Sequence, residues 1–339
     1  MIDLRTQRFS SLGKIQPAVS LQQALTQTVG VQAQQFRQAE VGLALQVPDL
    51  NRTELLNAYA NGDIVRTWAQ RWTYQLLTLE DWALVIAARL DEQLPTQYFQ
   101  GQQDFFEHLA LSLTQRLATV DHLSKADVNA QLDELAHRPL LSQERYTIFQ
   151  LVARTGAFTF VPKSGNRYEL QVQQPTLLSS TEAIEALMPR YLAGFGPANL
   201  LDFCKWAGLS ISRVRPLWQK ASRHWVACEY DNFMLETPTP IHLPEVILTS
   251  GFDAALTGYV DKRWLVSADH ERQLWTVNGS LNPIVILNGA VVGNWHFKVQ
   301  GKRMITTLDY WETVSNTQQD QVIAKLQRVA NFLGLTLVL

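Results

Sequence analysis

The chain has 339 residues and a formal net charge of −2, with 29 lysine and arginine residues against 31 aspartate and glutamate residues. Because 46% of its residues are hydrophobic, it can bury enough apolar surface for about two to four compact domains. The near-neutral charge excludes a global positive field, so any binding to nucleic acid must depend on local basic patches.

Several classes of protein are disfavoured by features that the sequence lacks. The N-terminal segment has no apolar signal-peptide core, and no apolar run reaches membrane-spanning length. The two cysteines, Cys204 and Cys228, have no metal-ligand spacing, and the seven histidines are scattered. We therefore expect a cytoplasmic protein with reduced thiols and without a metal or other cofactor, and no contact with a membrane.

The first predicted unit covers residues 1–100. Apolar residues recur at helical spacing on both sides of Gly30, and a further short helix ends near Gly62. Residues 64–77 are rich in β-branched and aromatic side chains, which is typical of a hairpin, and another helix over 82–90 follows. Helices followed by a two-stranded ribbon are the outline of a winged helix.

The same order of helices and hairpin is predicted twice more, over residues 101–178 and 179–240. In the second unit, two strands flank a turn with a basic tip at Lys163. The third unit has the clearest helix-turn-helix pattern, and its hairpin turns at Tyr230 and Asp231. We interpret the three units as an architectural repeat without obvious sequence identity.

Residues 241–339 are β-rich. Their packing is expected to give a small barrel or a strongly curled sheet, followed by a final amphipathic helix over 318–332. The predicted fold class is α+β, with three tandem winged-helix units followed by a small β-barrel-like domain and a C-terminal helix. The expected strands lie at residues 246–248, 264–266, 283–287, 291–297 and 304–308.

Two glutamines separated by one small residue follow the glycine of the first unit. In a regular helix, Gln32 and Gln34 would point roughly 200° apart, whereas in an extended or turn segment they share one side. A helix break at Gly30 would therefore let both amides converge on one site, with Ala33 turned into the core. On the tripeptide alone, an exposed polar helix end is the favoured interpretation.

The surrounding sequence changes that balance. The segment Gly-Val-Gln-Ala-Gln-Gln-Phe-Arg-Gln-Ala (30–39) is followed by Ile-Val-Arg-Thr-Trp-Ala-Gln-Arg (64–71) and by Gly-Tyr-Val-Asp-Lys (258–262). In this order and spacing, the segments resemble the bacterial tandem winged-helix DNA glycosylases of the AlkZ/YcaQ-like family. The resemblance covers nearly the whole chain, and its Gln32-Ala33-Gln34 matches the Gln-x-Gln, AlkZ-like branch.

The resemblance implies a monofunctional glycosylase for bulky N7-alkylpurines in double-stranded DNA, with interstrand cross-links as a further candidate substrate. It also implies catalysis by Gln32 and Gln34. Our hypothesis is that Gln34 positions the attacking water and that Gln32 supports this water and the deoxyribose. Neutral amides are chemically reasonable here, because an N7-alkylated purine carries positive charge and is already a good leaving group. We expect a monomer associated with the nucleoid.

Basic residues in four regions are candidates for contacts with DNA phosphates. A solvated surface is the alternative for each of them. In the first hairpin the basic residues alternate with aromatics that could stack on a base, although we favour packing within the hairpin for Trp68 and Trp82. The candidate DNA-binding residues are Arg66, Arg71, Lys163, Arg213, Arg215, Lys220, Arg223, Lys298, Lys302 and Arg303.

Two departures from the family pattern are visible. Gln75 stands where family members often have a histidine, which puts any role of that side chain in doubt. Lys262 replaces an arginine in the stretch Phe-Asp-x-x-x-x-Gly-Tyr-x-Asp-Arg, which Asp253, Tyr259 and Asp261 otherwise match. For these residues we favour a structural role over a chemical one.

Two other classes of function remain open from the sequence. A non-catalytic tandem winged-helix protein, such as a regulator or a damage-response factor, would bind selected sequences without cleaving bases. A protein-interaction scaffold would show no salt-dependent affinity for DNA.

Overall fold

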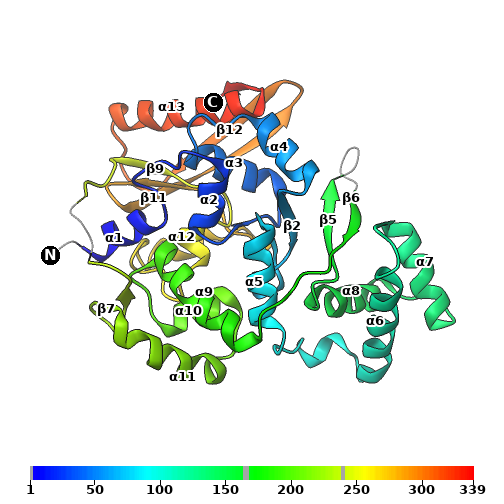
Figure 1. Ribbon diagram of the computed structural model, residues 1–339. Helices are drawn as coiled ribbons and strands as arrows, with labels where there is room; N and C mark the ends of the chain where they lie inside the picture. Colours follow the sequence, from blue (N-terminus) through cyan, green and yellow to red (C-terminus); the bar gives the residue numbers. More distant parts are fainter. Residues whose placement is uncertain (1–2, 163–167, 238–240) are drawn as a thin grey trace.

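The computed structural model describes residues 3–162, 168–237 and 241–339. Its helices and strands alternate along the chain, so the mixed α+β class is confirmed (Figure 1). Local signals start two of the helices: the Asn51 and Thr78 side chains accept hydrogen bonds from the first turns of the helices that follow them. The first unit contains α1 (Leu4–Ser11), α2 (Leu21–Gln27), β1 (Val31–Gln32), α3 (Phe36–Gln46), α4 (Arg52–Asn61), β2 (Ile64–Trp68), β3 (Tyr74–Thr78) and α5 (Leu79–Arg89).

The second unit repeats the order of helix, strand, two helices and two strands. Its first strand pairs with its last, as β1 pairs with β3 in the first unit. The tip of its hairpin, with Lys163, lies outside the described residues. The unit contains α6 (Gln103–Leu117), β4 (His122–Ser124), α7 (Lys125–Ala136), α8 (Ser142–Arg154), β5 (Phe158–Pro162) and β6 (Tyr168–Val172).

The sheets of these two units are joined edge to edge. Strands β2 and β5 pair antiparallel through Arg66 and Phe160, so one sheet runs in the order β1-β3-β2-β5-β6-β4. Figure 1 shows β2 and the β5–β6 hairpin side by side between the two groups of helices. The first unit therefore presents its glutamine motif on the edge strand of a sheet that spans both units.

The third unit has the same order with shorter strands. An isolated bridge between Ala198 and Phe233 takes the place of its first strand. Tyr230 and Asp231 both have positive φ, of 58° and 56°, which gives the tight hairpin turn that the sequence predicts. The unit contains α9 (Ser180–Phe195), α10 (Leu200–Ala207), α11 (Ile211–Ala221), β7 (Val226–Ala227) and β8 (Phe233–Met234).

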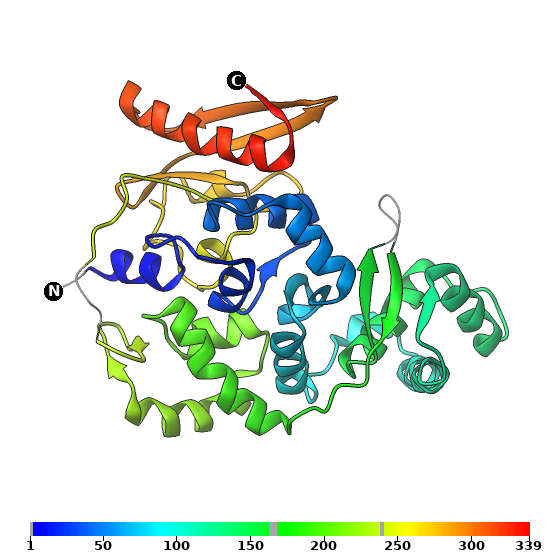
Figure 2. The same cartoon turned by 45° about the horizontal axis from the view of Figure 1, so that its top comes forward.

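The last part of the chain forms a five-stranded sheet that stays open. Its order is β13-β12-β11-β10-β9, and β9 and β13 make no pair with each other in the described residues. Of the two predicted forms, a barrel or a curled sheet, the barrel is therefore not closed, and the sheet is at most half of one. Figure 2 shows helix α13 lying along the long β11–β12 hairpin. The elements are β9 (Val246–Leu248), α12 (Ala254–Thr257), β10 (Ile284–Leu287), β11 (Ala290–Gln300), β12 (Arg303–Tyr310), α13 (Asn316–Leu333) and β13 (Thr336–Val338).

One predicted strand is wrong. Residues 264–266 form a turn, because the backbone amides of Leu265 and Val266 both donate to the carbonyl of Lys262, at 2.9 and 3.0 Å. All three side chains of this segment are buried. Their apolar character reflects a place in the core and not a place in a sheet.

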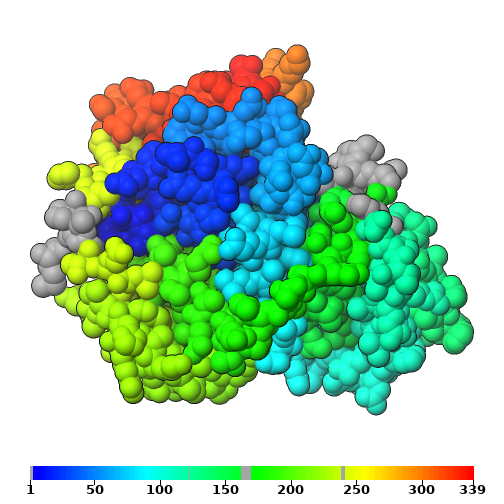
Figure 3. All heavy atoms as spheres, in the orientation of Figure 1, coloured from blue at the N-terminus to red at the C-terminus, as the bar shows by residue number. Residues whose placement is uncertain are grey.

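The cores cross the predicted unit boundaries. The largest one combines Phe9 and Trp82 of the first unit with Phe203 of the third and Leu265 of the last. The second unit has a core of its own, to which the first hairpin contributes Trp68. Figure 3 shows the second unit as a lobe at the side of the molecule. The first, third and last parts are thus packed around the glutamine motif as one body.

Candidate active site

The helix break at Gly30 is confirmed. Helix α2 ends at Gln27, and Gly30 has a φ of +98°. A Cβ at this position would lie 2.8 Å from the Cβ of Leu77 and 3.1 Å from the carbonyl oxygen of Leu76, so no larger residue fits without a shift. The break releases the chain into β1, which pairs antiparallel with β3. Gln32 therefore sits on a strand, and Ala33 is fully buried as expected.

Gln32 is held by an arginine from the β2–β3 hairpin. The Arg71 guanidinium donates through Nη2 to Oε1 of Gln32 at 2.9 Å. Because a guanidinium only donates, the amide oxygen must face Arg71, and Nε2 of Gln32 is a donor without a partner among the described residues. Arg71 also donates through Nη1 to the carbonyl of Thr257 at 2.9 Å, and burial lowers its pKa below the usual value.

Gln34 has a different environment. Its side chain is exposed, and it makes no hydrogen bond with any residue in the described part of the chain. Its backbone is fixed by Arg66, which donates to the carbonyls of Ala33 and Gln34 at 3.0 and 3.4 Å and stacks on Tyr74. The motif thus places one amide beside a cavity and the other on the surface, and the convergence of both on one site stays a prediction.

The cavity beside Gln32 is small, and four glutamine side chains contribute to its lining. Its volume is about 20 Å³, which is room for roughly one water molecule. Gln46 and Gln70 line it, and the Oε1 atoms of both have no partner among the described residues. Gln75 lies opposite Gln32 in the strand register, lines the same cavity and donates to Oγ1 of Thr73 at 2.7 Å.

Comparison with known proteins identifies the chain. The family model "DNA glycosylase AlkZ-like" matches residues 25–332. The chain belongs to the AlkZ-like DNA glycosylase family. It is therefore a glycosylase, a hydrolase of DNA repair, and the non-catalytic alternatives are set aside.

Two relatives of the AlkZ-like chain are informative. An interstrand DNA cross-link repair glycosylase from Streptomyces sahachiroi is 24% identical over 334 residues, covering 86% of this chain and 85% of the relative. The solved structure of the Streptomyces sahachiroi DNA glycosylase AlkZ matches with a TM-score of 0.82 at 19% identity, over 99% of this chain and 98% of that one. The overall fold is therefore that of AlkZ.

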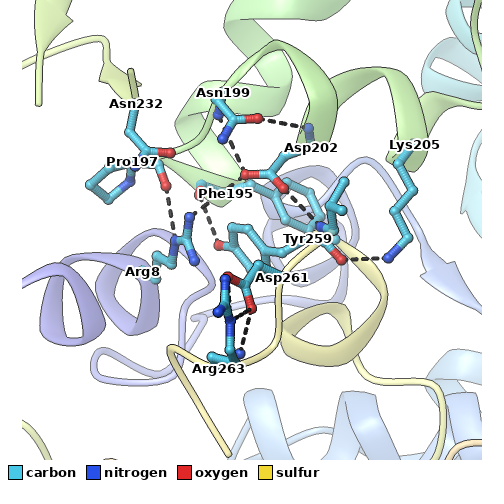
Figure 4. Close-up of polar contacts among 12 residues, drawn as sticks. Arg8, Phe195, Pro197, Asn199, Asp202, Lys205, Asn232, Tyr259, Asp261 and Arg263 are labelled. Carbon is cyan, nitrogen blue, oxygen red and sulfur yellow. Dashed lines mark hydrogen bonds and ion pairs between the residues drawn. The ribbon is translucent and has the colours of Figure 1, made fainter. Parts of the chain in front are cut away.

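Residues 252–262, which match the family's Phe-Asp-x-x-x-x-Gly-Tyr-x-Asp-Arg stretch, make contacts within the AlkZ-like chain itself. Asp253 caps α12 and forms a buried ion pair with Lys14 at 2.7 Å. The Tyr259 hydroxyl donates to the carbonyl of Phe195 at 2.8 Å, and burial holds its pKa far above the usual value (Figure 4). Asp261 pairs with Arg263 on the surface. These contacts support the structural interpretation of the stretch.

The predicted basic residues of the third unit differ in whether they form ion pairs with carboxylates of the protein. Arg213 is committed to Glu92 at 2.6 Å and Asp91 at 2.9 Å, so its charge is already neutralised. Lys220 pairs with Glu185 at 3.0 Å but stays 76% exposed. Arg215 and Arg223 are exposed and have no ion pair within the described residues.

The other predicted basic residues fall into two groups. Lys298, Lys302 and Arg303 are all exposed at the end of the β11–β12 hairpin. Arg66 and Arg71, in contrast, hold protein atoms next to the glutamine motif.

Sequence reasoning missed Gln70 and the cavity role of Gln75. Gln70 is 2% exposed and donates to the carbonyl of Val29 at 2.6 Å, which fixes the turn before β1. A polar residue between two aromatic strands is the signal that could have found it. In the described ranges no group of histidine, cysteine and carboxylate side chains could hold a metal ion, and no helix there is long and apolar enough to cross a membrane.

Proposed function

We propose that this glycosylase hydrolyses the N-glycosidic bond of N7-alkylated purines in double-stranded DNA, with Gln32 and Gln34 in catalytic roles. The observation that carries the proposal is the fixed orientation of Gln32, whose Oε1 is held by Arg71 at 2.9 Å. The Nε2 donor then faces the substrate side without reorganisation during the reaction. The exposed Gln34 amide has both a donor and an acceptor to offer a water.

The reaction needs little more than this geometry. Water adds to C1′ as the bond to N9 breaks, the alkylated purine leaves as a neutral base, and a proton is released to solvent. The positive charge of the lesion supplies most of the leaving ability, so a positioned water and a hydrogen bond to the deoxyribose suffice. A strong carboxylate base is not required.

The size of the cavity supports bulky substrates. About 20 Å³ beside Gln32 is far too small for an extruded purine, so the lesion must be met from the open side of the motif. A site that does not enclose the base sets no upper limit on the size of the adduct. This favours bulky N7-alkylpurines, and it makes cross-linked bases candidate substrates of this chain, as the name of its Streptomyces relative says for that protein.

The DNA-binding part of the proposal rests on repeated topology and on exposed charge. Each of the first three units has the helix, strand, helix, helix, strand, strand order of a winged helix, with a bridge as the first strand of the third. We assign phosphate contacts to Arg215, Lys220, Arg223 and to the hairpin residues Lys298, Lys302 and Arg303. We further propose that the chain acts as a monomer on nucleoid DNA.

Excision of N7-methylguanine from a duplex tests the proposal. The Gln32→Ala/Gln34→Ala double variant should lose base release, measured as alkali-labile strand breaks. Gln35→Ala is the matched control, because Gln35 is exposed beside the motif and its side chain does not cap α3. Undiminished base release by the double variant would refute the assignment.

Gln32→Glu separates the two ends of the amide. A carboxylate keeps an oxygen for Arg71 but replaces the Nε2 donor with an acceptor. Loss of activity in this variant, with folding intact by circular dichroism, would assign the role to Nε2.

A further inference from the structure

Two cations from distant elements converge on one short segment of the chain. Arg71, in the turn between β2 and β3, donates to the carbonyl of Thr257 at 2.9 Å. Lys205, on α10, donates through Nζ to the carbonyl of Tyr259 at 2.6 Å (Figure 4). The same segment continues to Lys262, which adds a third positive charge. We call Arg71, Lys205 and Lys262 together the cation triad.

Lys262 is the unusual member of the triad. It is only 8% exposed, yet its side chain makes no ion pair with any residue in the described ranges, and the polar group next to it is the amino group of Lys205. The centroid of the Trp275 ring lies 5.8 Å from Nζ of Lys262, which is at the outer limit of a cation–π contact. A buried ammonium group without a counter-charge is unfavourable, and proteins rarely retain one without a use.

The nearby carboxylates offset the charge of the triad only in part: Asp202 acts on Lys205 and raises its pKa, but less than Lys262 and Arg71 lower it. Asp202 accepts from the backbone amide of Val260 at 2.8 Å and lies 3.6 Å from the Arg8 guanidinium. Asp261 is paired with Arg263 at 2.6 Å on the surface (Figure 4). Both acids are therefore occupied by other partners.

Like charges affect one another within the triad. Burial and then the neighbouring charge of Lys262 lower the pKa of Lys205 to about 8, with a smaller effect from Arg71. Contacts with carbonyls at the end of α12 explain why Arg71 and Lys205 sit where they do. They do not explain Lys262, which has no such contact within the described residues.

We propose that the cation triad binds one phosphate of the DNA backbone next to the lesion, an inference that rests on the proposed glycosylase function. A backbone phosphodiester carries one negative charge on two non-bridging oxygens, which accept hydrogen bonds from cationic N–H donors. Lys205 and Trp275 are both partly exposed, so the triad lies just beneath the surface. Because Arg71 also holds Gln32, a phosphate seated there fixes the damaged strand relative to the catalytic amide.

A scan with neutral backbone linkages tests this site. Single methylphosphonate linkages are placed at successive positions around N7-methylguanine, and duplex affinity is measured by fluorescence anisotropy. The wild type should lose about tenfold in affinity at one position beside the lesion. Lys262→Met should bind the normal duplex about tenfold more weakly and should lose nothing further at that position. Lys205→Met provides a second variant with the same expected pattern.

Lys302→Met is the matched control, because Lys302 is an exposed lysine on the distant β11–β12 hairpin. It should weaken binding of all duplexes equally and keep the position-dependent loss. Uniform tolerance of neutral linkages by a wild type that excises the base would overturn the phosphate site alone. Absence of binding and of excision by the wild type would instead overturn the proposed function, and the site with it.

Thermal unfolding gives an independent readout. Removing an uncompensated buried charge should leave the Tm of Lys262→Met equal to or above that of the wild type. Inorganic phosphate should raise the Tm of the wild type more than that of the variant. A lower Tm for the variant, with the linkage pattern unchanged, would show a purely structural lysine and overturn the proposal.

Discussion

Two cavities with no lining residue in common border the β2–β3 hairpin. The one beside Gln32 has about 20 Å³, and its lining combines four glutamines and the Arg71 guanidinium with Phe195, Trp206 and Phe252. The other has about 670 Å³, lies toward the second unit and is lined by Trp68, Tyr74, Tyr146 and other aromatics. The larger hollow is the less suited to chemistry, because its aromatic rings contact one another and its Arg145 is paired with Asp133 at 2.8 Å.

The difference indicates that the two sides of one hairpin have different roles, one in stability and the other in base excision. Trp68 packs against Tyr74 at 5.0 Å and Phe160 at 5.4 Å between ring centroids, which joins the first unit to the second. The polar side instead keeps hydrogen-bonding groups fixed but unsatisfied. We expect substitutions on the aromatic side to change stability and substitutions on the polar side to change the rate of base excision.

The largest expected effect is on the aromatic side. Trp68→Ala should lower the free energy of unfolding by about 3–5 kcal/mol, because a 5% exposed indole is removed from a close-packed cluster. Urea unfolding followed by circular dichroism measures the change. Excision per folded molecule should stay within about threefold of the wild type, and Trp68→Phe should recover part of the stability. A stable but inactive variant would contradict this difference in roles.

The next effect is on the polar side. Gln32→Ala should slow single-turnover excision about 10²-fold, the usual cost of losing one preorganised hydrogen-bond donor at a reacting centre. Tyr146→Leu is the matched change in the aromatic cavity, at a residue that is 38% exposed, and should leave the rate within about threefold. Equal losses in both variants would remove the distinction between the two cavities.

The Gly208→Ala substitution should displace the turn that carries Arg71. Gly208 has a φ of +70°, and a Cβ there would lie 2.8 Å from Cα of Arg71 and against the Arg89 guanidinium. The substitution should destabilise the protein by about 1–3 kcal/mol and slow excision, because the turn that carries Arg71 must move. Thermal unfolding and the excision assay together measure this. A variant that loses stability but keeps the full rate would show that the position of Arg71 is not critical.

A smaller effect concerns pH. The pKa of Lys205 falls from 10.5 to about 8 on folding, chiefly through burial. Between these values the unfolded chain binds the extra proton, so the stability contributed by this group rises with pH from about 8 to about 10.5 and is lost as pH falls through about 8. The stability of the wild type relative to Lys205→Met should therefore increase across this window, as measured by urea unfolding. A constant difference would contradict the shifted pKa.

The smallest effect is expected at the position that departs from the family pattern. Gln75→His restores the family's histidine opposite Gln32 and removes the contact with Thr73. We expect a change of less than about threefold in excision at neutral pH, because the cationic lesion needs no strong general acid. A large gain with a new pH dependence near the pKa of histidine would show that the missing side chain matters.

Features that depend on neighbouring residues could be predicted from the sequence. The break at Gly30 follows from the steric freedom of glycine, and the Thr78 cap from the preference of hydroxyls for helix N-termini. The turn at Tyr230 and Asp231 lies between two apolar runs. In each case the deciding interaction spans only a few residues.

Features that depend on partners distant in the sequence could not be predicted from it. The join between β2 and β5 links residues 66 and 160, and neither strand carries a local signal for it. Arg213 appears as a free basic residue in its helix, although its partners Asp91 and Glu92 lie about 120 positions earlier. The same limit hid the placement of Gln75 against Gln32, because register is set by the whole sheet.

The seam between the first two units passes through Arg66. Arg66 pairs with Phe160 in the sheet, and its guanidinium donates hydrogen bonds to the backbone carbonyls of Ala33 and Gln34. The pairing that joins the two units and the contacts that fix the backbone of the motif therefore depend on one and the same residue.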